Sequence, residues 1–580
     1  MTHTTTPQPA RRTSAAVVPV LAFAGIVVAV MQTLLVPVIK DLPKLLGTAP
    51  SNATWVLTST LLAGAVATPI MGRLGDLYGK RRMLLMSLSV MVVGSLIAGF
   101  TSDLLVMIAG RALQGFAMGA IPLGIGLMRD MLPREKLGSA MALMSSSIGV
   151  GGGLALPLAA LVAQHADWHS LFFLAAGLGV VSIVLTLVAV PESPMRAKGT
   201  FDVLGAIGLS AGLVLFLLPI TKGSDWGWTS GTTLGLFGAS AVVLVLWGVM
   251  ELRVQAPLVD LRTTVRRSVL FTNLASIMVG VSFYVVSLVL PQLLQLPTAT
   301  GYGLGRSMVV AGLCVAPLGL TMMFTAPVYA RISAKYGPKV TLIIGMLIIG
   351  IGYGAGLGLM SAAWQTIVIS VILGAGIGLA YSSLPALIVG SVPASETGAA
   401  NGLNTLMRSI GTSVSSAVIG MVLANTAADA GGGVALPTMH GFRLSFLIAT
   451  GAVGIGLVMA LFLPRQRQAT KPQLRASSAE DAALERAQEI LGGFRGRVLD
   501  TDGAPVARAK VTLIDRRGRQ AGATLSGEDG SYALAVPAQG AYVLAARAAG
   551  HGPLASSATH SGDDRPVDLD LALPAETVPA

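Results

Sequence analysis

The chain has 580 residues, of which 53% are apolar and 11% charged, and its mean hydropathy is +0.74. Soluble domains carry roughly 25% charged residues, so this composition excludes an ordinary soluble protein and predicts one that lies largely in lipid. The net charge of +12 is spread over short loops, without a basic face or an aromatic RNA-binding motif, which excludes a nucleic-acid partner. The single cysteine, Cys314, excludes a disulfide framework and a cysteine-based metal site.

A polar tail over residues 1–16 precedes an apolar segment from Val17 to Ile39, which is too long for a secretory signal and fits a retained membrane helix. Polar interruptions divide the following chain into apolar segments of roughly 20 residues, the length that crosses a hydrocarbon core. They lie near residues 53–71, 83–101, 104–128, 139–163, 169–191, 202–220, 232–251, 268–293, 306–330, 339–360, 364–391, 400–424 and 441–463. With the first segment, they predict an all-α polytopic membrane protein of about fourteen transmembrane helices.

Basic residues are concentrated in alternate gaps between these segments, from Arg11 and Arg12 near the start to the cluster over residues 465–471. The other gaps hold few lysines or arginines. Because cytoplasmic loops carry the excess of Lys and Arg, we expect a multi-pass protein of the plasma or inner membrane with both termini in the cytoplasm.

Residues 72–81, GRLGDLYGKR, recur in altered form as residues 330–339, ARISAKYGPK. The matched pairs are Arg73 and Arg331, Tyr78 and Tyr336, Gly79 and Gly337, and Arg81 and Lys339. In the second copy, Ala334 replaces Asp76. Two related halves are typical of alternating-access transporters. We therefore expect six-helix bundles over residues 17–200 and 268–464, with two additional helices over residues 201–252.

The composition changes after Pro464. Residues 465–492 predict a polar linker with a short helix, and residues 493–575 alternate apolar and polar positions between turn signals, which predicts a small cytoplasmic β-sandwich. Its opening, GRVLDTDGAPVARAKVTLID, resembles carboxypeptidase regulatory-like (transthyretin-like) domains. No catalytic constellation is visible there. A binding or stabilising module and an inert appendage both remain open, and the partner of the sandwich is unidentified.

Residues 72–84, GRLGDLYGKRRML, reverse the chain between two apolar helices, which requires glycines and places cations at a membrane surface. The segment resembles the loop between the second and third helices of the major facilitator superfamily. That resemblance implies that the acid contacts a helix end and basic residues of the opposite half, closing a gate. The implied gating residues are Gly72, Asp76, Gly79, Arg81 and Arg82. A solvated hairpin turn is the alternative.

Arg111 lies inside the apolar run VMIAGRALQGFAMGA. A guanidinium in lipid keeps its proton, so it must face the bundle interior and meet acceptors there. With Gln114, the run resembles the superfamily's fourth-helix motif, which implies a role in proton coupling for both residues; Asp41 is a candidate proton carrier. A purely structural tie between helices is the alternative for Arg111.

Gly149, Gly153 and Pro157 favour close packing and a bend in the fifth predicted helix. The run resembles the antiporter motif g-x-x-x-G-P-x-x-G-G that is associated with exporters. It departs from that motif because Pro157 lacks a preceding glycine and Ala159 and Ala160 replace the final pair.

The segment ANGLNTLMRSIG, residues 400–411, resembles the fourteen-helix drug/proton antiporters. The resemblance implies that Asn401, Asn404 and Arg408, with Thr33 of the first helix, line a substrate cavity; for the two asparagines, packing between helices is the alternative. Those antiporters commonly carry an aspartate in the first helix, where this chain has Met31. This departure leaves the proton carrier open and raises the prospect of neutral or anionic substrates.

Together these patterns predict a transporter that exports drug-like or secondary-metabolite small molecules by alternating access, with protons as the counter-ion. An importer of the same fold and a membrane receptor that signals through the sandwich are the alternatives. The expected partners are a small-molecule substrate, protons and the lipid bilayer. We expect no enzymatic activity, no cofactor and no metal.

Overall fold

The computed structural model describes residues 16–35, 38, 41–429, 435–464, 493–516, 518–536, 539–560 and 567–575. The chain divides into two compact units, Met1–Gln466 and Arg467–Ala580, and each is described by itself. The predicted linker with its short helix over residues 465–492 and nearly all of the N-terminal tail lie outside the described residues.

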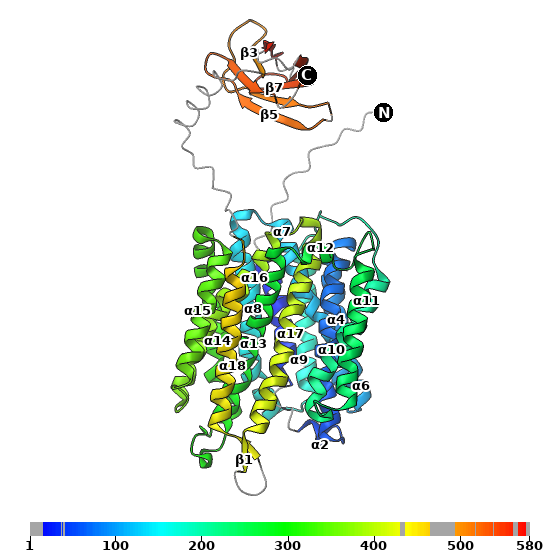
Figure 1. Cartoon of the computed structure of the whole chain (residues 1–580), viewed down its shortest axis with the longest axis vertical. Helices are drawn as coiled ribbons and strands as arrows, with labels where there is room; N and C mark the ends of the chain where they lie inside the picture. Colours follow the sequence, from blue (N-terminus) through cyan, green and yellow to red (C-terminus); the bar gives the residue numbers. More distant parts are fainter. Residues whose placement is uncertain are drawn as a thin grey trace. The chain divides into compact units, whose positions relative to one another are not determined.

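The first unit is a bundle of long apolar helices (Figure 1). Among the described residues, 13 helical segments are long and apolar enough to cross a membrane. They are α4 (Trp55–Tyr78, preceded by α3, Pro50–Ala53), α5 (Lys80–Gly99), α6 with η2 and α7 (Leu104–Gly115, Phe116–Gly119, Ala120–Met131), α8 (Arg134–His165), α9 (Ser170–Ala189), α10 (Val203–Trp226), α11 (Gly231–Glu251), α13 (Arg267–Gln295), α14 (Met308–Tyr336), α15 (Pro338–Gly356), α16 (Ala363–Val389), α17 (Thr397–Asn425, preceded by η4, Ala394–Glu396) and α18 (Met439–Leu461). The shorter apolar helix α1 (Val17–Thr33) adds another. The predicted fold class, a polytopic helical membrane protein, is confirmed.

The helices differ from the sequence prediction in several places. Helix α4 does not end near residue 71 but continues through the motif to Tyr78, so the chain reverses at Gly79. Helix α1 ends at Thr33, whose hydroxyl donates to the carbonyl of Ala29 at 3.0 Å, and does not continue to Ile39. The span that begins at Leu104 contains the 3-10 turn η2 directly after Gly115. A Cβ atom on Gly115 would lie 2.6 Å from the carbonyl oxygen of Thr60, so the span passes against α4 at a distance that only glycine permits.

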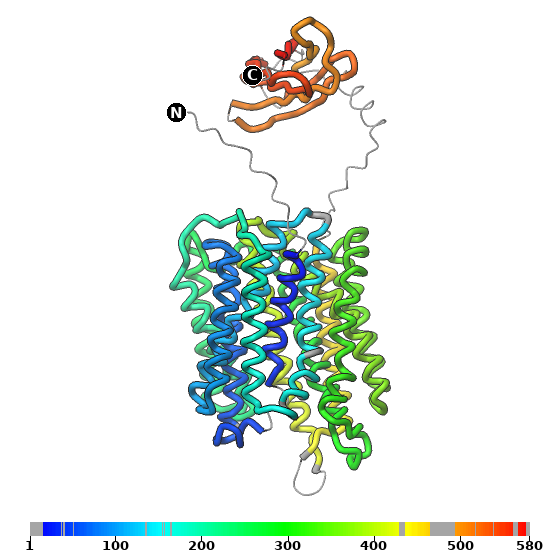
Figure 2. The backbone as a smooth tube through the Cα atoms, turned by 180° about the vertical axis from the view of Figure 1, so that it is seen from behind, coloured from blue at the N-terminus to red at the C-terminus, as the bar shows by residue number. Residues whose placement is uncertain are grey.

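The two largest buried apolar clusters of the bundle, called its two cores here, lie one in each half of the sequence. The first core contains residues of α1 and of the helices from α4 through α9, and the second contains residues of the helices from α13 through α18. Figure 2 shows α1 in the middle of the rear view, between the blue-to-cyan helices and the green helices. The halves meet where α8 crosses α14: a Cβ atom on Gly319 would lie 2.1 Å from the carbonyl oxygen of Gly149. Small residues allow this close contact between helix backbones.

Helices α10 and α11 are additional to the two cores, and α11 lies at the edge of the bundle (Figure 1). Leu209 and Leu213 of α10 belong to a buried cluster that also contains Ala65 of α4 and Leu403 of α17. Because α4 belongs to one half and α17 to the other, α10 packs across the junction between the halves.

The two ends of the bundle are named here by residues that lie at them. At the Asp76 end, α4 ends and α5 begins, and Lys339 donates to the carbonyl of Leu461 at 2.8 Å where α18 ends. At the opposite end, α8 ends at His165, and the short helix α2 (Leu42–Leu45) and the hairpin of β1 (Ala427–Asp429) and β2 (Ala435–Pro437) are found.

The second unit is a pair of β-sheets. The strand β3 (Gly493–Leu499) pairs antiparallel with β6 (Ser531–Ala535) and parallel with β9 (Val567–Asp568) and β10 (Leu571–Ala572). The other sheet has the antiparallel order β5 (Gln520–Leu525), β4 (Lys510–Ile514), β7 (Gly540–Arg547) and β8 (Leu554–His560). One buried cluster contains Phe494 and Leu534 of the first sheet with Val511 and Leu544 of the second. The predicted sandwich therefore has a core formed by both sheets.

Candidate functional site

The carboxylate of Asp76, in the last turn of α4, binds the first turn of α17. Its Oδ1 accepts a hydrogen bond from the main-chain amide of Gly398 at 3.0 Å, and its Oδ2 accepts one from Ala399 at 2.8 Å. The Asp76 side chain is fully buried. Free amides and the helix dipole make a helix N-terminus favourable for a carboxylate, by about 0.5–2 kcal/mol. Gly72 lies beside this contact, where a Cβ atom would be 2.3 Å from the carbonyl oxygen of Gly398.

Lys80 completes a buried charge cluster at the same place. Its Nζ lies 3.3 Å from Asp76 Oδ1 and 2.7 Å from Asp130 Oδ2, and all three side chains are buried. The hydroxyl of Ser193 donates to Asp130 Oδ2 at 2.5 Å. Gly79 has φ of 114° between α4 and α5, a conformation that favours glycine and turns Lys80 back toward Asp76. Two carboxylates thus compensate the buried ammonium group.

Arg81 and Arg82 face their own half of the protein. Their amides donate to Glu192, at 3.0 Å to Oε1 and 3.2 Å to Oε2, and Arg81 Nη2 donates to the carbonyl of Leu187 at 2.8 Å. Both acceptors lie at the end of α9 or just after it. These two residues therefore fix the start of α5 against α9, whereas the contact with the other half comes from Asp76.

Arg129, at the end of α7, makes a second contact between the halves that the sequence motifs did not indicate. Its Nη1 donates to the hydroxyl of Thr397 at 2.5 Å and to the carbonyl of Pro393 at 3.2 Å, and its Nη2 donates to the carbonyl of Val392 at 2.8 Å. The signal in the sequence was the basic cluster that follows the predicted helix over residues 104–128. The partners of Arg129 are mainly backbone carbonyls, and because every residue has a carbonyl, they leave no pattern in the sequence.

Arg111 is 2% exposed within the N-terminal half. Its Nε donates to the carbonyl of Val56 at 3.2 Å and its Nη1 to Gln114 Oε1 at 2.6 Å, while Gln114 in turn donates to the hydroxyl of Ser95 at 2.7 Å. Nη1 also lies 3.9 Å from the sulfur of Met31, the residue that stands in place of the first-helix aspartate. The guanidinium is thus held by neutral acceptors.

Asp41 does not join this group. It is exposed just before α2, where its side chain does not cap the helix, and it is not among the hydrogen-bond partners of Arg111 in the described structure.

The glycines of α8 lie on the crossing with α14. A Cβ atom on Gly149 would be 2.3 Å from the sulfur of Met322, and one on Gly153 would be 3.2 Å from the carbonyl oxygen of Ala316. Helix α8 continues through Pro157 to His165. The predicted helix-bend residues thus lie at the close contact between the halves, or one to two turns beyond it.

Among the predicted cavity residues, Asn404 packs between helices. Its Nδ2 donates to Asn273 Oδ1 at 2.9 Å and to the hydroxyl of Ser276 at 2.7 Å, both on α13. Asn401 donates to the carbonyl of Thr397 at 3.0 Å, and its Oδ1 is buried without a hydrogen-bond partner in the part of the chain that the structure describes. These contacts favour packing over cavity lining for Asn404.

Arg408 is also buried, with its guanidinium 4.7 Å from the ring centre of Tyr381 and its Nη2 3.4 Å from the hydroxyl of Thr405. Thr33, by contrast, is in another helix, and its hydroxyl bonds within α1. No contact in the described structure joins Thr33 to Asn401, Asn404 or Arg408.

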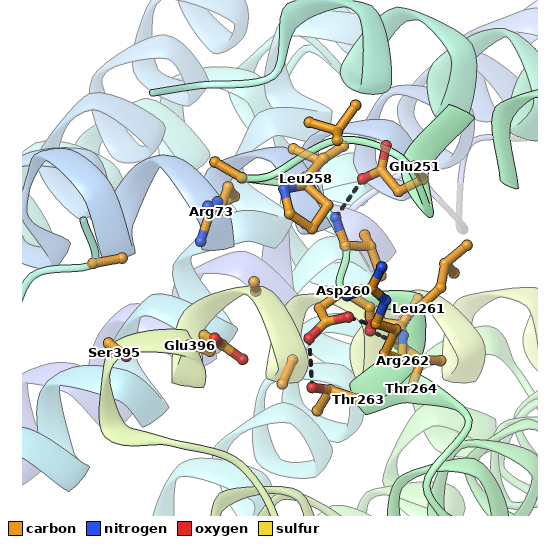
Figure 3. Close-up of a pocket in the computed structure, with 18 of the residues that line it drawn as sticks. Arg73, Glu251, Leu258, Asp260, Leu261, Arg262, Thr263, Thr264, Ser395 and Glu396 are labelled. Carbon is orange, nitrogen blue, oxygen red and sulfur yellow. Dashed lines mark hydrogen bonds between the residues drawn. The ribbon is translucent and has the colours of Figure 1, made fainter. Parts of the chain in front are cut away.

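A cavity of about 300 Å³ opens at the Asp76 end between the halves and the segment that follows α11. Figure 3 shows Arg73 of α4 between the segment that carries Leu258 and the turn that carries Ser395 and Glu396. Glu251, at the end of α11, also lines it. Arg73 is 6% exposed, and its Nε has no hydrogen-bond partner among the described residues.

Two family models match this chain, one over the helical unit and one over the sandwich. The family model of the Major Facilitator Superfamily matches residues 21–416 and, again, residues 272–499. The model of the carboxypeptidase regulatory-like domain matches residues 493–574.

Relatives include the tetracenomycin C resistance and export protein of Streptomyces glaucescens, 27% identical over 65% of this chain and 70% of that protein. Multidrug resistance protein 3 of Bacillus subtilis is 26% identical over 64% of this chain and 72% of that protein. The probable actinorhodin transporter of Streptomyces coelicolor is 30% identical over 65% of this chain and 66% of that protein.

Among solved structures, the proton:xylose symporter XylE has a TM-score of 0.56 at 15% identity, over 77% of this chain and 95% of that chain. At this identity the likeness shows the fold. The chain belongs to the major facilitator superfamily of membrane transporters, and it ends in a carboxypeptidase regulatory-like domain.

Proposed function

We propose that this protein exports drug-like or secondary-metabolite small molecules by alternating access, in exchange for protons. The relatives named as exporters or multidrug resistance proteins support the substrate class and the direction. The observation that carries the mechanism is the contact of Asp76 with Gly398 and Ala399. It joins the two halves at the Asp76 end through hydrogen bonds that a rocking motion can break.

The Asp76 end faces the cytoplasm in this proposal. Arginines and lysines gather there, in the segments 73–82, 129–136, 253–267 and 331–339, and cytoplasmic loops carry such an excess. The structure then represents the conformer that is closed to the cytoplasm. Opening requires that Asp76 leave the start of α17 and that Arg129 release Thr397 and the neighbouring carbonyls.

The halves would rock about the close crossing of α8 and α14. Gly149 and Gly319 bring the two backbones together there, and the side chain that packs on Gly149, that of Met322, is flexible enough to adjust when the angle between the helices changes. Arg111 and Gln114 belong to the coupling route. Met31 stands where the aspartate would be, and no carboxylate contacts Arg111 in the described structure. The positive charge of Arg111 in the interior of this half favours neutral or anionic substrates over lipophilic cations.

Accumulation of fluorescent or radiolabelled drugs in a hypersensitive bacterial host tests the direction. An exporter lowers steady-state accumulation when the chain is expressed, and a protonophore restores it. Raised accumulation would support an importer of the same fold, and unchanged accumulation across a chemically broad panel would contradict transport of such compounds.

A further inference from the structure

Two carboxyl groups meet at the Asp76 end of the additional helices. Asp202 immediately precedes α10, and Glu251 is the last residue of α11. A Cβ atom on Gly205 would lie 2.4 Å from Asp202 Oδ2 and 2.7 Å from Glu251 Oε2, so the two oxygens flank the same point. The two carboxyl groups are within hydrogen-bonding reach of each other.

Each acid uses its other oxygen to hold the backbone. Asp202 Oδ1 accepts from the amide of Gly205 at 2.7 Å, and Glu251 Oε1 accepts from the amide of Val259 at 2.8 Å. The facing oxygens, Oδ2 and Oε2, are both buried and have no donor in the described structure. Glu251 is 2% exposed, and the ion pairs found among the described residues include neither acid. Two ionised carboxylates in this position would repel each other and leave two acceptors unpaired.

We propose that Asp202 and Glu251 share one proton and form a proton-binding site separate from the Asp76 contact. The O–H of one carboxyl group donates to the facing carboxylate oxygen, so a single proton satisfies both oxygens and the pair carries one negative charge. When that proton leaves to water, the pair carries two adjacent negative charges. Close carboxyl pairs behave in this way because like charges at such a distance do not both ionise readily. The proposal does not depend on the transported compound or its direction.

The cavity beside Glu251 gives this site access to water and sets its electrostatic surroundings. The charged groups that line the cavity with Glu251 are Arg73 of α4, Lys198 of the loop before α10, Asp260 and Arg262 of the segment after α11, and Glu396 of η4. Both signs are represented, and Asp260 is already bound by Thr263 and by the amide of Arg262. Loss of the proton of the pair would add one negative charge beside this cavity.

Loss of the proton would act on the junction between the halves. Glu251 holds Val259, and Arg262 donates to the carbonyl of Leu252 at 3.2 Å, so the segment after α11 is folded against the end of that helix. The same segment faces Glu396 and Ala399 across the cavity, at the start of the helix that Asp76 binds. Repulsion between the two acids would separate α10 from α11 and loosen this packing, so we expect alkaline pH to favour opening at the Asp76 end.

Infrared difference spectroscopy of the purified full-length protein tests the shared proton. The wild type should show a carboxylic-acid C=O band at neutral pH that shifts in D2O. Asp202→Asn and Glu251→Gln should each abolish this band, because a carboxamide donates to the remaining carboxylate and replaces the proton. Persistence of the band in Asp202→Asn would mean that Glu251 holds a proton alone, and absence of the band from the wild type would mean that no proton is shared; either result overturns the proposal.

Asp260→Asn is the matched control, since it removes an acid from the same cavity. Burial raises the pKa of Asp260. Hydrogen bonds from the Thr263 hydroxyl and from the amides of Thr263 and Arg262 lower it by a larger amount, so the pKa of Asp260 lies below its usual range. Its carboxylate is ionised at neutral pH, and the control should keep the wild-type band.

Spin labels at Tyr78 and Tyr336 measure the effect on the gate. These tyrosines end α4 and α14, one in each half, and are 46% and 57% exposed, and the only native cysteine, Cys314, is replaced by serine. The inter-label distance in the wild type should lengthen between pH 6 and pH 9, whereas Glu251→Gln should hold the shorter distance at both. A wild-type distance that ignores pH, or a variant that follows it equally, overturns the coupling to the gate.

Discussion

Asp76 Oδ1 accepts a hydrogen bond from the amide of Gly398 at 3.0 Å, although 322 residues separate the two in sequence. The contact joins the last turn of one half to the first turn of a helix in the other, and Gly72 allows the backbones to approach closely enough for it to form. The charge of Asp76 is matched on one side by the N-terminus of α17 and on the other by Lys80. This arrangement makes Asp76 the residue whose loss should weaken the closed conformer most directly.

Asp76→Asn should reduce transport by roughly tenfold or more, equivalent to about 1.4 kcal/mol in the balance between conformers. Asparagine offers one oxygen to two amide donors and carries no charge for Lys80. The initial rate of drug efflux, normalised to the amount of protein in the membrane, measures the effect. Asp103→Asn is the control, because Asp103 caps α6 within its own half. Equal rates in the two variants would remove the gating role of Asp76.

Gly319→Leu should abolish transport and separate the halves at the crossing of α8 and α14. A Cβ atom there would lie 2.1 Å from the carbonyl oxygen of Gly149, which belongs to the backbone of α8 and cannot rotate away as a side chain could. Gly177→Leu provides the comparison, since a Cβ atom at Gly177 meets no atom within 4 Å. The yield of cross-links between α8 and α14 measures the separation of the halves, and the rate of drug efflux measures transport. Normal efflux from Gly319→Leu would rule out the close crossing as the pivot.

Met31→Asp should strengthen the dependence of transport on the proton gradient and extend it to lipophilic cations. The new carboxylate would face Nη1 of Arg111, now 3.9 Å from the methionine sulfur, and would add a titratable group to the interior of the half. Uptake of ethidium into inverted vesicles should rise several-fold over Met31→Asn, which adds polarity without charge. Identical uptake by the two variants would place the coupling route away from Arg111.

Deletion of residues 467–580 should leave transport within about twofold of the full-length protein. The helical unit has its own two cores, and the sandwich has a separate one formed by both of its sheets. Efflux from cells that express equal amounts of the two forms provides the comparison. If the deletion abolished the cellular phenotype while vesicle flux was absent from both forms, the protein would act as a receptor through the sandwich.

Much of the fold could be predicted because membrane helices are encoded by long apolar segments and strands by alternation. The strand Leu554–His560 has a weaker signal than the others, since its sequence LASSATH contains small and polar residues and its side chains are mostly half-buried or exposed. Helix ends were less predictable, as at Thr33, where side-chain hydrogen bonding and the local turn set the boundary within an apolar run.

The candidate site was predictable only on one side of each contact. Asp76 stands out in its motif, but its partners Gly398 and Ala399 contribute backbone amides, which any residue except proline supplies. The approach of Asp202 to Glu251 is likewise invisible in sequence, because it depends on α10 and α11 packing antiparallel so that the start of one meets the end of the other.

Transport into inverted membrane vesicles tests the central proposal most directly. A panel of dyes and antibiotics would be presented with an imposed proton gradient, acidic inside, and without one. Proton-coupled export predicts concentrative uptake that requires the gradient and collapses when a protonophore is added. Uptake that ignores the gradient would contradict proton exchange, and uptake found only in right-side-out vesicles would contradict export.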